Sequence, residues 1–169
     1  MNDNNNIHNI EYSFLSFYND YSDQIFRFCF IKTSNRDVAL DLTQETFTKM
    51  WEYIAEKKEE IREPKSLLYR IATNLVIDYY RKKKSESLEA LIEYGFNPEE
   101  TMSISLEKEL EIKELHLKLY KLEDKYKDIL IMRFVEDMSL EEIAKVYDQH
   151  ANTIAVRIHR AIEKLKTLY

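Results

Sequence analysis

Apolar residues recur at helical spacing through the first half of the chain. Aromatic residues dominate residues 11–32 and predict a first helix with an aromatic core face. Ser34, followed three residues later by Asp37, is typical of a helix N-terminus, so we expect Ser34 to cap a second helix that runs to about residue 57. The residues predicted to face its core are Val38, Leu42, Phe47, Met50 and Trp51.

A third amphipathic helix is predicted over residues 64–84, where Pro64 suits the first turn. Its apolar stripe contains Leu68, Ile71, Ala72, Leu75 and Tyr79. A polar face contains Arg70, Asn74, Asp78 and Arg81, and four consecutive cations, Arg81, Lys82, Lys83 and Lys84, end the segment. Six cations and one acid give this segment a charge of +5, in a chain of net charge −6. This contrast favours contact with phosphate, although cations in a last turn also complement the helix dipole.

The second half begins with a change in composition. Residues 85–105 contain five acids, no cation, Gly95 and Pro98, which predicts an acidic linker. Helical periodicity resumes at residue 106. With one glycine and two prolines in the whole chain, we predict an all-α protein: a helical domain over 8–84, the linker over 85–105 and a second helical domain over 106–169.

A helix-turn-helix is predicted near the end of the chain. Ser139 and Glu142 form a capping box that opens a short helix over 140–147, and a final helix follows over 153–166. Thr153, Arg157, Arg160 and Lys164 are expected to align on the solvent side, opposite the apolar residues. Arginine can bond guanine bidentately in the major groove, whereas four cations on an ordinary surface helix remain the alternative interpretation.

The composition argues against several classes of function. A single glycine rules out glycine-rich phosphate loops, Cys29 is the lone cysteine, and the four histidines lack metal-ligand spacing. No nucleophilic motif is recognisable. We therefore expect no enzyme activity, no cofactor and no metal. The chain lacks a signal-peptide core and any run of membrane-spanning length, so we expect a cytoplasmic protein without membrane insertion.

Several blocks of the sequence resemble bacterial extracytoplasmic-function (ECF) sigma factors of the sigma-70 family. Residues 37–51 resemble region 2.2, residues 14–30 resemble region 2.1, and residues 64–84 are similar to regions 2.3 and 2.4. Residues 119–165 resemble region 4. The blocks occur in the family's order and spacing. The resemblance implies a factor that binds core RNA polymerase and directs promoter recognition and DNA melting in transcription initiation.

The resemblance also implies roles for individual residues. The positions matching the polymerase-binding face are Asp41, Leu42, Gln44 and Glu45. A loop over about 55–63 would capture a flipped base of the minus-ten element, beside strand contacts from Arg70, Asn74, Asp78, Arg81, Lys82, Lys83 and Lys84. The implied readers of the minus-thirty-five element are Thr153, Val156, Arg157, Arg160 and Lys164. Regulation by an anti-sigma factor is a further implication.

Two features depart from the family pattern. Asp148 and Gln149 stand where a glycine and an apolar residue are usual, and Ala155 and Val156 replace polar or basic residues. Both affect base preference; Val156 can contact a thymine methyl. The competing hypothesis is a stand-alone helix-turn-helix regulator, which leaves the blocks similar to regions 2.2 and 2.4 unexplained. A helical adaptor protein fits the basic helices poorly. With its net charge of −6, the free chain is expected to bind duplex DNA weakly.

Overall fold

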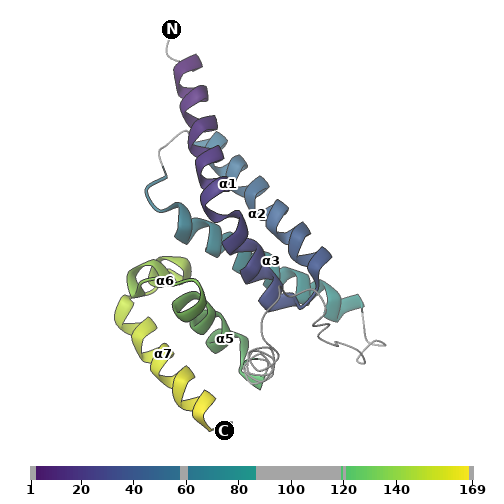
Figure 1. The fold of residues 1–169 in the computed structure, drawn as a ribbon, viewed down its shortest axis with the longest axis vertical. Helices are drawn as coiled ribbons and strands as arrows, with labels where there is room; N and C mark the ends of the chain where they lie inside the picture. Colours follow the sequence, from purple (N-terminus) through teal and green to yellow (C-terminus); the bar gives the residue numbers. More distant parts are fainter. Residues whose placement is uncertain (1–2, 58–60, 87–118, 120, 168–169) are drawn as a thin grey trace, which may run out of the picture. The chain divides into compact units, whose positions relative to one another are not determined.

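A computed structural model of the protein describes residues 3–57, 61–86, 119 and 121–167. These described residues form helices and connecting turns, without a strand among them. The backbone contacts divide the chain into two compact units, Met1–Gly95 and Phe96–Tyr169. Figure 1 shows the helices of each unit in sequence colours.

The first unit is built from α1 (Asp3–Thr33), α2 (Arg36–Lys57) and α3 (Pro64–Glu86), each of which packs against the other two. Its core is apolar and draws on all three helices: Ile25, Phe28, Leu42, Met50, Ile54, Leu68, Tyr69, Ala72, Leu75 and Val76. Phe28 of α1 meets Tyr69 of α3 edge to face, with ring centroids 5.3 Å apart. This geometry is favoured by the aromatic quadrupole and fixes the two helices against each other.

The aromatic face predicted for the first helix is confirmed where α1 packs on α2. The ring centroid of Phe14 lies 5.2 Å from that of Trp51 and 6.3 Å from that of Phe47. Tyr18 also contacts Phe47, with 4.9 Å between centroids. All three pairs are edge-to-face, so the aromatic residues at helical spacing form a continuous seam along α1 and α2.

The junction between α1 and α2 differs from the prediction. Ser34 is not the N-cap of α2: it has φ 51°, in the left-handed region, and its N–H donates to the carbonyl of Phe30 at 2.8 Å. Ser34 therefore terminates α1. Asn35 takes the capping role, because its side-chain oxygen accepts the N–H of Val38 at 3.0 Å.

The start of α3 is as predicted, with Pro64 at its first position. The carbonyl of Glu63 accepts the N–H of Leu67 at 3.1 Å, so Glu63 occupies the N-cap position. The loop expected over 55–63 is shorter than predicted, because residues 55–57 form the last turn of α2. Residues 58–60 lie outside the described part of the chain.

The second unit contains α5 (Asp124–Leu130), the short π-helix η2 (Ile131–Val135), α6 (Leu140–Tyr147) and α7 (Ala151–Lys166). Both α5 and α6 pack against α7. The buried side chains that join them are Ile129, Met132, Ile143, Ile154, Ile158 and Ala161. The final helix thus starts two residues earlier than predicted, after His150.

The predicted helix-turn-helix is present. The Ser139 hydroxyl accepts the N–H of Glu142 at 3.1 Å, and the Glu142 carboxylate accepts the N–H of Ser139 at 2.7 Å, which completes the capping box. Asp148 has φ 52° and ψ 50°, the left-handed conformation that glycine adopts most easily. Asp148 can therefore form the tight turn between α6 and α7 in place of a glycine.

Most of the predicted linker lies outside the described residues, as does the periodic segment over 106–118. Helix α3 continues to Glu86 and so extends two residues into the expected linker. The domain boundaries at 84/85 and 105/106 stay predictions. No described helix is both long enough and apolar enough to cross a membrane. Within the described ranges, no cluster of three or more His, Cys, Asp or Glu side chains is arranged to hold a metal ion.

Candidate functional site

The solvent face of α2 carries three of the four residues predicted to bind polymerase. Asp41, Gln44 and Glu45 are exposed, and Glu45 forms an ion pair with Lys49 at 3.8 Å one turn later. The fourth residue, Leu42, is only 6% exposed. Leu42 therefore belongs to the core rather than to this surface, because it shares the buried side of α2 with Thr46 and Met50.

Two buried threonines, Thr43 and Thr46, belong to the core side of α2. The hydroxyl of Thr43 donates to the carbonyl of Ala39 at 2.6 Å, and that of Thr46 donates to the carbonyl of Leu42 at 2.7 Å. These local bonds satisfy the hydroxyls and allow both residues to face the core. Burial also raises the pKa of the nearby Cys29 thiol to about 12, against a smaller opposing effect of its bond to Thr43. A thiol of this kind is unreactive at neutral pH.

The predicted polar face of α3 is present on the surface. Arg70, Asn74, Arg81 and Lys82 are exposed, and Asp78 is partly exposed. Arg81 forms an ion pair with Asp78 at 2.9 Å within the helix. The Lys83 ammonium lies 5.8 Å from the ring centroid of Tyr79. The side chain of Lys84 lies outside the described part of the structure.

This face also carries an exposed apolar residue that the sequence pattern did not predict. Ile77 is 56% exposed and lies on the same side of α3 as Arg70, Asn74 and Arg81. The buried side of α3 is also wider than predicted, since Tyr69 and Val76 join the core. The reason is that α1 and α2 both cover α3, and a stripe read at simple helical spacing accounts for one neighbour only.

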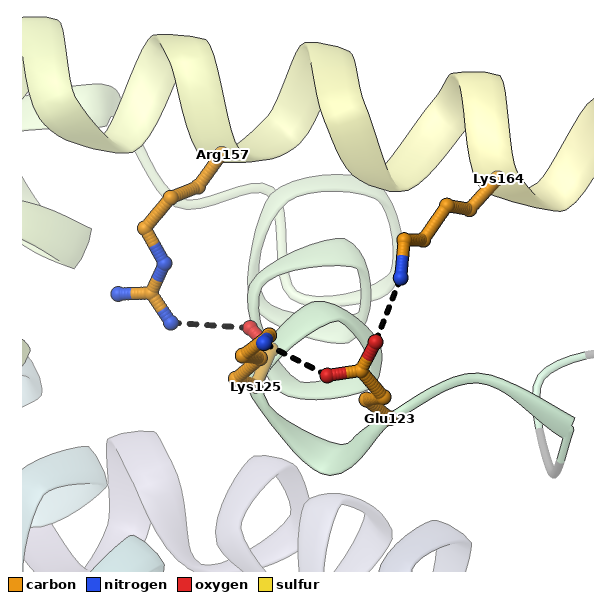
Figure 2. Close-up of polar contacts among 4 residues, drawn as sticks. All are labelled: Glu123, Lys125, Arg157 and Lys164. Carbon is orange, nitrogen blue, oxygen red and sulfur yellow. Dashed lines mark hydrogen bonds and ion pairs between the residues drawn. The ribbon is translucent and has the colours of Figure 1, made fainter.

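The predicted DNA-reading residues of α7 divide into two groups. Thr153, Val156 and Arg160 are exposed, with Val156 at 49%. Arg157 instead reaches across to α5 (Figure 2): its Nη2 donates to the backbone carbonyl of Lys125 at 3.0 Å, and its Nη1 donates to the Gln149 side chain, also at 3.0 Å. The guanidinium also lies 4.8 Å from the ring centroid of Tyr147.

Lys164 makes a second bridge from α7 to the start of α5. Its Nζ bonds one carboxylate oxygen of Glu123 at 2.5 Å, and the Nζ of Lys125 pairs with the other oxygen at 2.6 Å (Figure 2). The Lys164 ammonium also lies 4.7 Å from the ring centroid of Tyr126. The hydrogen bonds from Lys125 and then Lys164 lower the pKa of Glu123 to about 2. In turn, the bond to Glu123 raises the pKa of Lys164.

Of the four residues expected on the solvent side of α7, Thr153, Arg160 and Lys164 are exposed, and Arg157 is only partly exposed. Lys164 is exposed but also pairs with Glu123. At about 100° of rotation per residue, their row is centred about a quarter turn from the apolar stripe of α7, not half a turn away. Residues at that angle lie at the edge of the α5 contact. Long side chains there can reach back to α5, as Arg157 and Lys164 do.

Comparison with known proteins identifies the family. Sigma-70 region 2 matches residues 17–86, and Sigma-70, region 4 matches residues 112–165. The ECF RNA polymerase sigma factor SigW of Bacillus subtilis is 33% identical over 160 residues, which cover 86% of this chain and 83% of that protein. The chain belongs to the ECF sigma factors. The sigma factor SigV of the same organism is 32% identical over 152 residues, covering 87% of this chain and 85% of the relative.

Solved structures support the same fold for this ECF sigma factor. The sigma factor RpoE, in a complex with the anti-sigma factor NepR from Bartonella quintana, matches with a TM-score of 0.73 at 24% identity, over 92% of this chain and 96% of that one. CnrH, in a complex with the cytosolic domain of CnrY, matches with a TM-score of 0.66 at 19% identity, over 94% and 88%. The predicted all-α fold with region 2 and region 4 domains is confirmed. The prediction of a sigma factor, rather than a stand-alone regulator, is also confirmed.

Proposed function

We propose that this ECF sigma factor binds core RNA polymerase through the solvent face of α2. The observation that carries this proposal is the joint exposure of Asp41, Gln44 and Glu45 on a helix whose other side is packed into the core. Two carboxylates and an amide suit a basic partner surface, where complementary charge speeds association and selects the partner. Leu42 supports this face from beneath and makes no direct contact in this proposal.

Contact with the minus-ten element is assigned to the polar face of α3. Arg70, Arg81 and the lysines at 82–84 offer charge to phosphates, while Asn74 and Asp78 offer hydrogen-bonding groups to bases. A protein that traps a flipped base must compensate a few kcal/mol of unstacking, and phosphate contacts beside the trap contribute to that. Residues 61–63, the described part of the expected loop that lies beyond α2, lead directly into α3.

Contact with the minus-thirty-five element is assigned to the exposed residues of α7. Thr153 lies near the helix N-terminus, where the recognition helix of a helix-turn-helix meets base edges. Arg160 can bond guanine bidentately, and the Val156 methyls can pack on thymine. We propose a non-enzymatic, cofactor-free role in the cytoplasm, and an anti-sigma factor as a further partner. The sigma factor RpoE, which has a similar fold, was solved as a complex of that kind.

Selection of duplex DNA with and without polymerase tests the proposal. The full chain is incubated with a random-sequence duplex library, either alone or with bacterial core RNA polymerase, and the retained DNA is sequenced. We expect a two-part promoter motif to be enriched only when polymerase is present. Enrichment of a single motif at nanomolar affinity without polymerase would contradict the proposal and favour a stand-alone regulator.

A further inference from the structure

We propose that Glu123 is a positioning residue that holds Lys164 against α5, and that Lys164 and Arg157 fix α7 in place rather than contact DNA. This inference rests on the proposed function, because it concerns how the second unit meets duplex DNA. Arg160, Val156 and Thr153 keep the proposed contact with the minus-thirty-five element. Glu123 lies before the first residue of α5, outside the helix-turn-helix itself.

The geometry of Glu123 is that of a shared acceptor. Each of its two carboxylate oxygens bonds a different lysine, Lys125 beside it and Lys164 on α7 (Figure 2). The Lys164 ammonium has a second favourable contact in the ring of Tyr126. A DNA phosphate would have to compete with both groups for this ammonium.

Arg157 repeats the arrangement about two helical turns earlier on the same edge of α7. Both of its terminal nitrogens donate within the protein, one to the carbonyl of Lys125 and one to Gln149, and its Cζ lies 4.8 Å from the ring centroid of Tyr147. These bonds use two of the five guanidinium N–H groups, so a bidentate contact with guanine through the two terminal nitrogens would compete with them. Arg157 and Lys164 thus clamp α7 to the first turn of α5 at two points.

Three of the four Arg and Lys side chains of α7 have a partner within the second unit. Lys166 pairs with Glu163 of the same helix at 2.9 Å. Among the described residues, Arg160 is the α7 cation without a hydrogen bond or ion pair. Phosphate contacts add affinity that is independent of sequence, whereas base contacts add discrimination. Holding Lys164 away from phosphate lowers non-specific binding and leaves selection to Thr153, Val156 and Arg160.

The salt dependence of DNA binding tests this inference in the intact holoenzyme. The probe is the duplex recovered by selection with the wild-type holoenzyme, and a mixed-sequence duplex measures non-specific binding. Each phosphate contact contributes about 0.9 to the slope of log affinity against log salt. We expect Lys164→Gln to leave the slope unchanged. Glu123→Gln should steepen it by about 0.9 for each lysine released, so affinity falls a further three- to fourfold between 50 and 200 mM salt for each.

Two further variants separate pairing from net charge. Lys164→Arg keeps a cation opposite Glu123 and should behave as wild type. Glu123→Gln alone should steepen the salt-dependence slope. In the combined Glu123→Gln and Lys164→Gln variant, the part of this increase in slope that depends on Lys164 should disappear. The inference would be overturned if Glu123→Gln increased the slope equally in the presence and absence of Lys164. It would also be overturned if Lys164→Gln alone reduced the slope by about 0.9.

A readout without DNA keeps this inference distinct from the proposed function. Hydrogen exchange of α7 amides is compared in wild type, both single variants and the combined variant of the free chain. Loss of protection in each single variant, with no further loss in the combined one, is the expected coupling. Independent effects of the two substitutions would overturn the inference. Failure of the wild-type holoenzyme to select any duplex would instead contradict the proposed function, while the exchange result still decides the role of Glu123.

Discussion

Helices α3 and α7 carry similar rows of polar and basic residues and use them differently. On α3, Arg70, Asn74 and Arg81 lie about half a turn from the buried stripe and are exposed. On α7, Arg157 and Lys164 lie about a quarter turn from the stripe and are bound to α5. The same spacing along the sequence therefore gives a solvent face in one helix and a packing edge in the other.

The angle between a polar row and the apolar stripe of its helix thus decides whether the row faces solvent or packs on a neighbouring helix. A row opposite the stripe is available to a partner. A row beside the stripe is within reach of the neighbouring helix, and long side chains cover its edge. Arg and Lys in such a place contribute first to the packing of their own unit.

The largest effect is expected from the buried side of α3. Leu68 is fully buried, so Leu68→Ala should lower the free energy of unfolding of the first unit by about 2–5 kcal/mol. Ile77→Ala, on the exposed side of the same helix, should change it by less than about 0.5 kcal/mol. Trp51, the single tryptophan, packs on Phe14 and reports this unit by its fluorescence during denaturation. Equal losses in the two variants would contradict the assignment of the two faces.

Removal of Arg160 should reduce promoter selectivity. Because each good base contact contributes about 1–3 kcal/mol, Arg160→Ala should lower discrimination at one base pair of the minus-thirty-five element by about that amount. The measurement compares holoenzyme affinity for the selected duplex and its single-base variants. Arg157→Ala is the matched control, since it removes the same side chain from the packed edge. Loss of discrimination at one base pair in Arg157→Ala, and not in Arg160→Ala, would reverse the roles.

Removal of Arg157 should destabilise the second unit instead. Two hydrogen bonds and a cation–π contact together predict a loss of about 1–2 kcal/mol for Arg157→Ala. Arg81→Ala on α3 removes an exposed ion pair within one helix and should cost less than about 0.5 kcal/mol in the first unit. Hydrogen exchange of the α7 and α3 amides measures both. Unchanged protection of α7 in Arg157→Ala would refute the packing role.

The smallest expected effect is the loss of the stabilising Glu123 ion pairs at acidic pH. The pKa of Glu123 is lowered from its ordinary 4.5 to about 2, first by the bond from Lys125 and then by that from Lys164. Since the folded pKa is below the unfolded one, the pair stabilises the protein above pH 4.5 and loses this contribution as pH falls toward 2. Carbon NMR of the Glu123 carboxylate should show titration near pH 2, and Lys164→Gln should raise the pKa. Titration of wild-type Glu123 near 4.5 would contradict the pairing.

Much of the fold could be predicted from the sequence because its signals are local. The Ser139–Glu142 box, the proline at the start of α3 and the aromatic seam of α1 each depend on residues close in the chain or on simple periodicity. The α1–α2 junction could not be predicted as easily. Ser34 and Asn35 both suit an N-cap, and Ser34 is used to end α1.

The candidate site was predicted less completely, because it depends on contacts between segments far apart in the sequence. Glu123 and Lys164 are 41 residues apart, and no local pattern joins them. Leu42 was expected both in the core and on the polymerase-binding face, and the structure places it in the core. The contact of Arg157 and Lys164 with a neighbouring helix could have been predicted. Their angle beside the apolar stripe of α7 can be calculated from the spacing alone.

Binding to core RNA polymerase is the direct test of the proposal that the solvent face of α2 contacts the polymerase. The full chain is labelled with a fluorophore at an exposed site away from α2, and its anisotropy is followed as bacterial core RNA polymerase is added. We predict saturable submicromolar binding that is weakened by Gln44→Ala and by Glu45→Ala and is unchanged by Arg160→Ala. No binding by the folded full chain, together with none by residues 1–84 if they fold alone, would contradict the account.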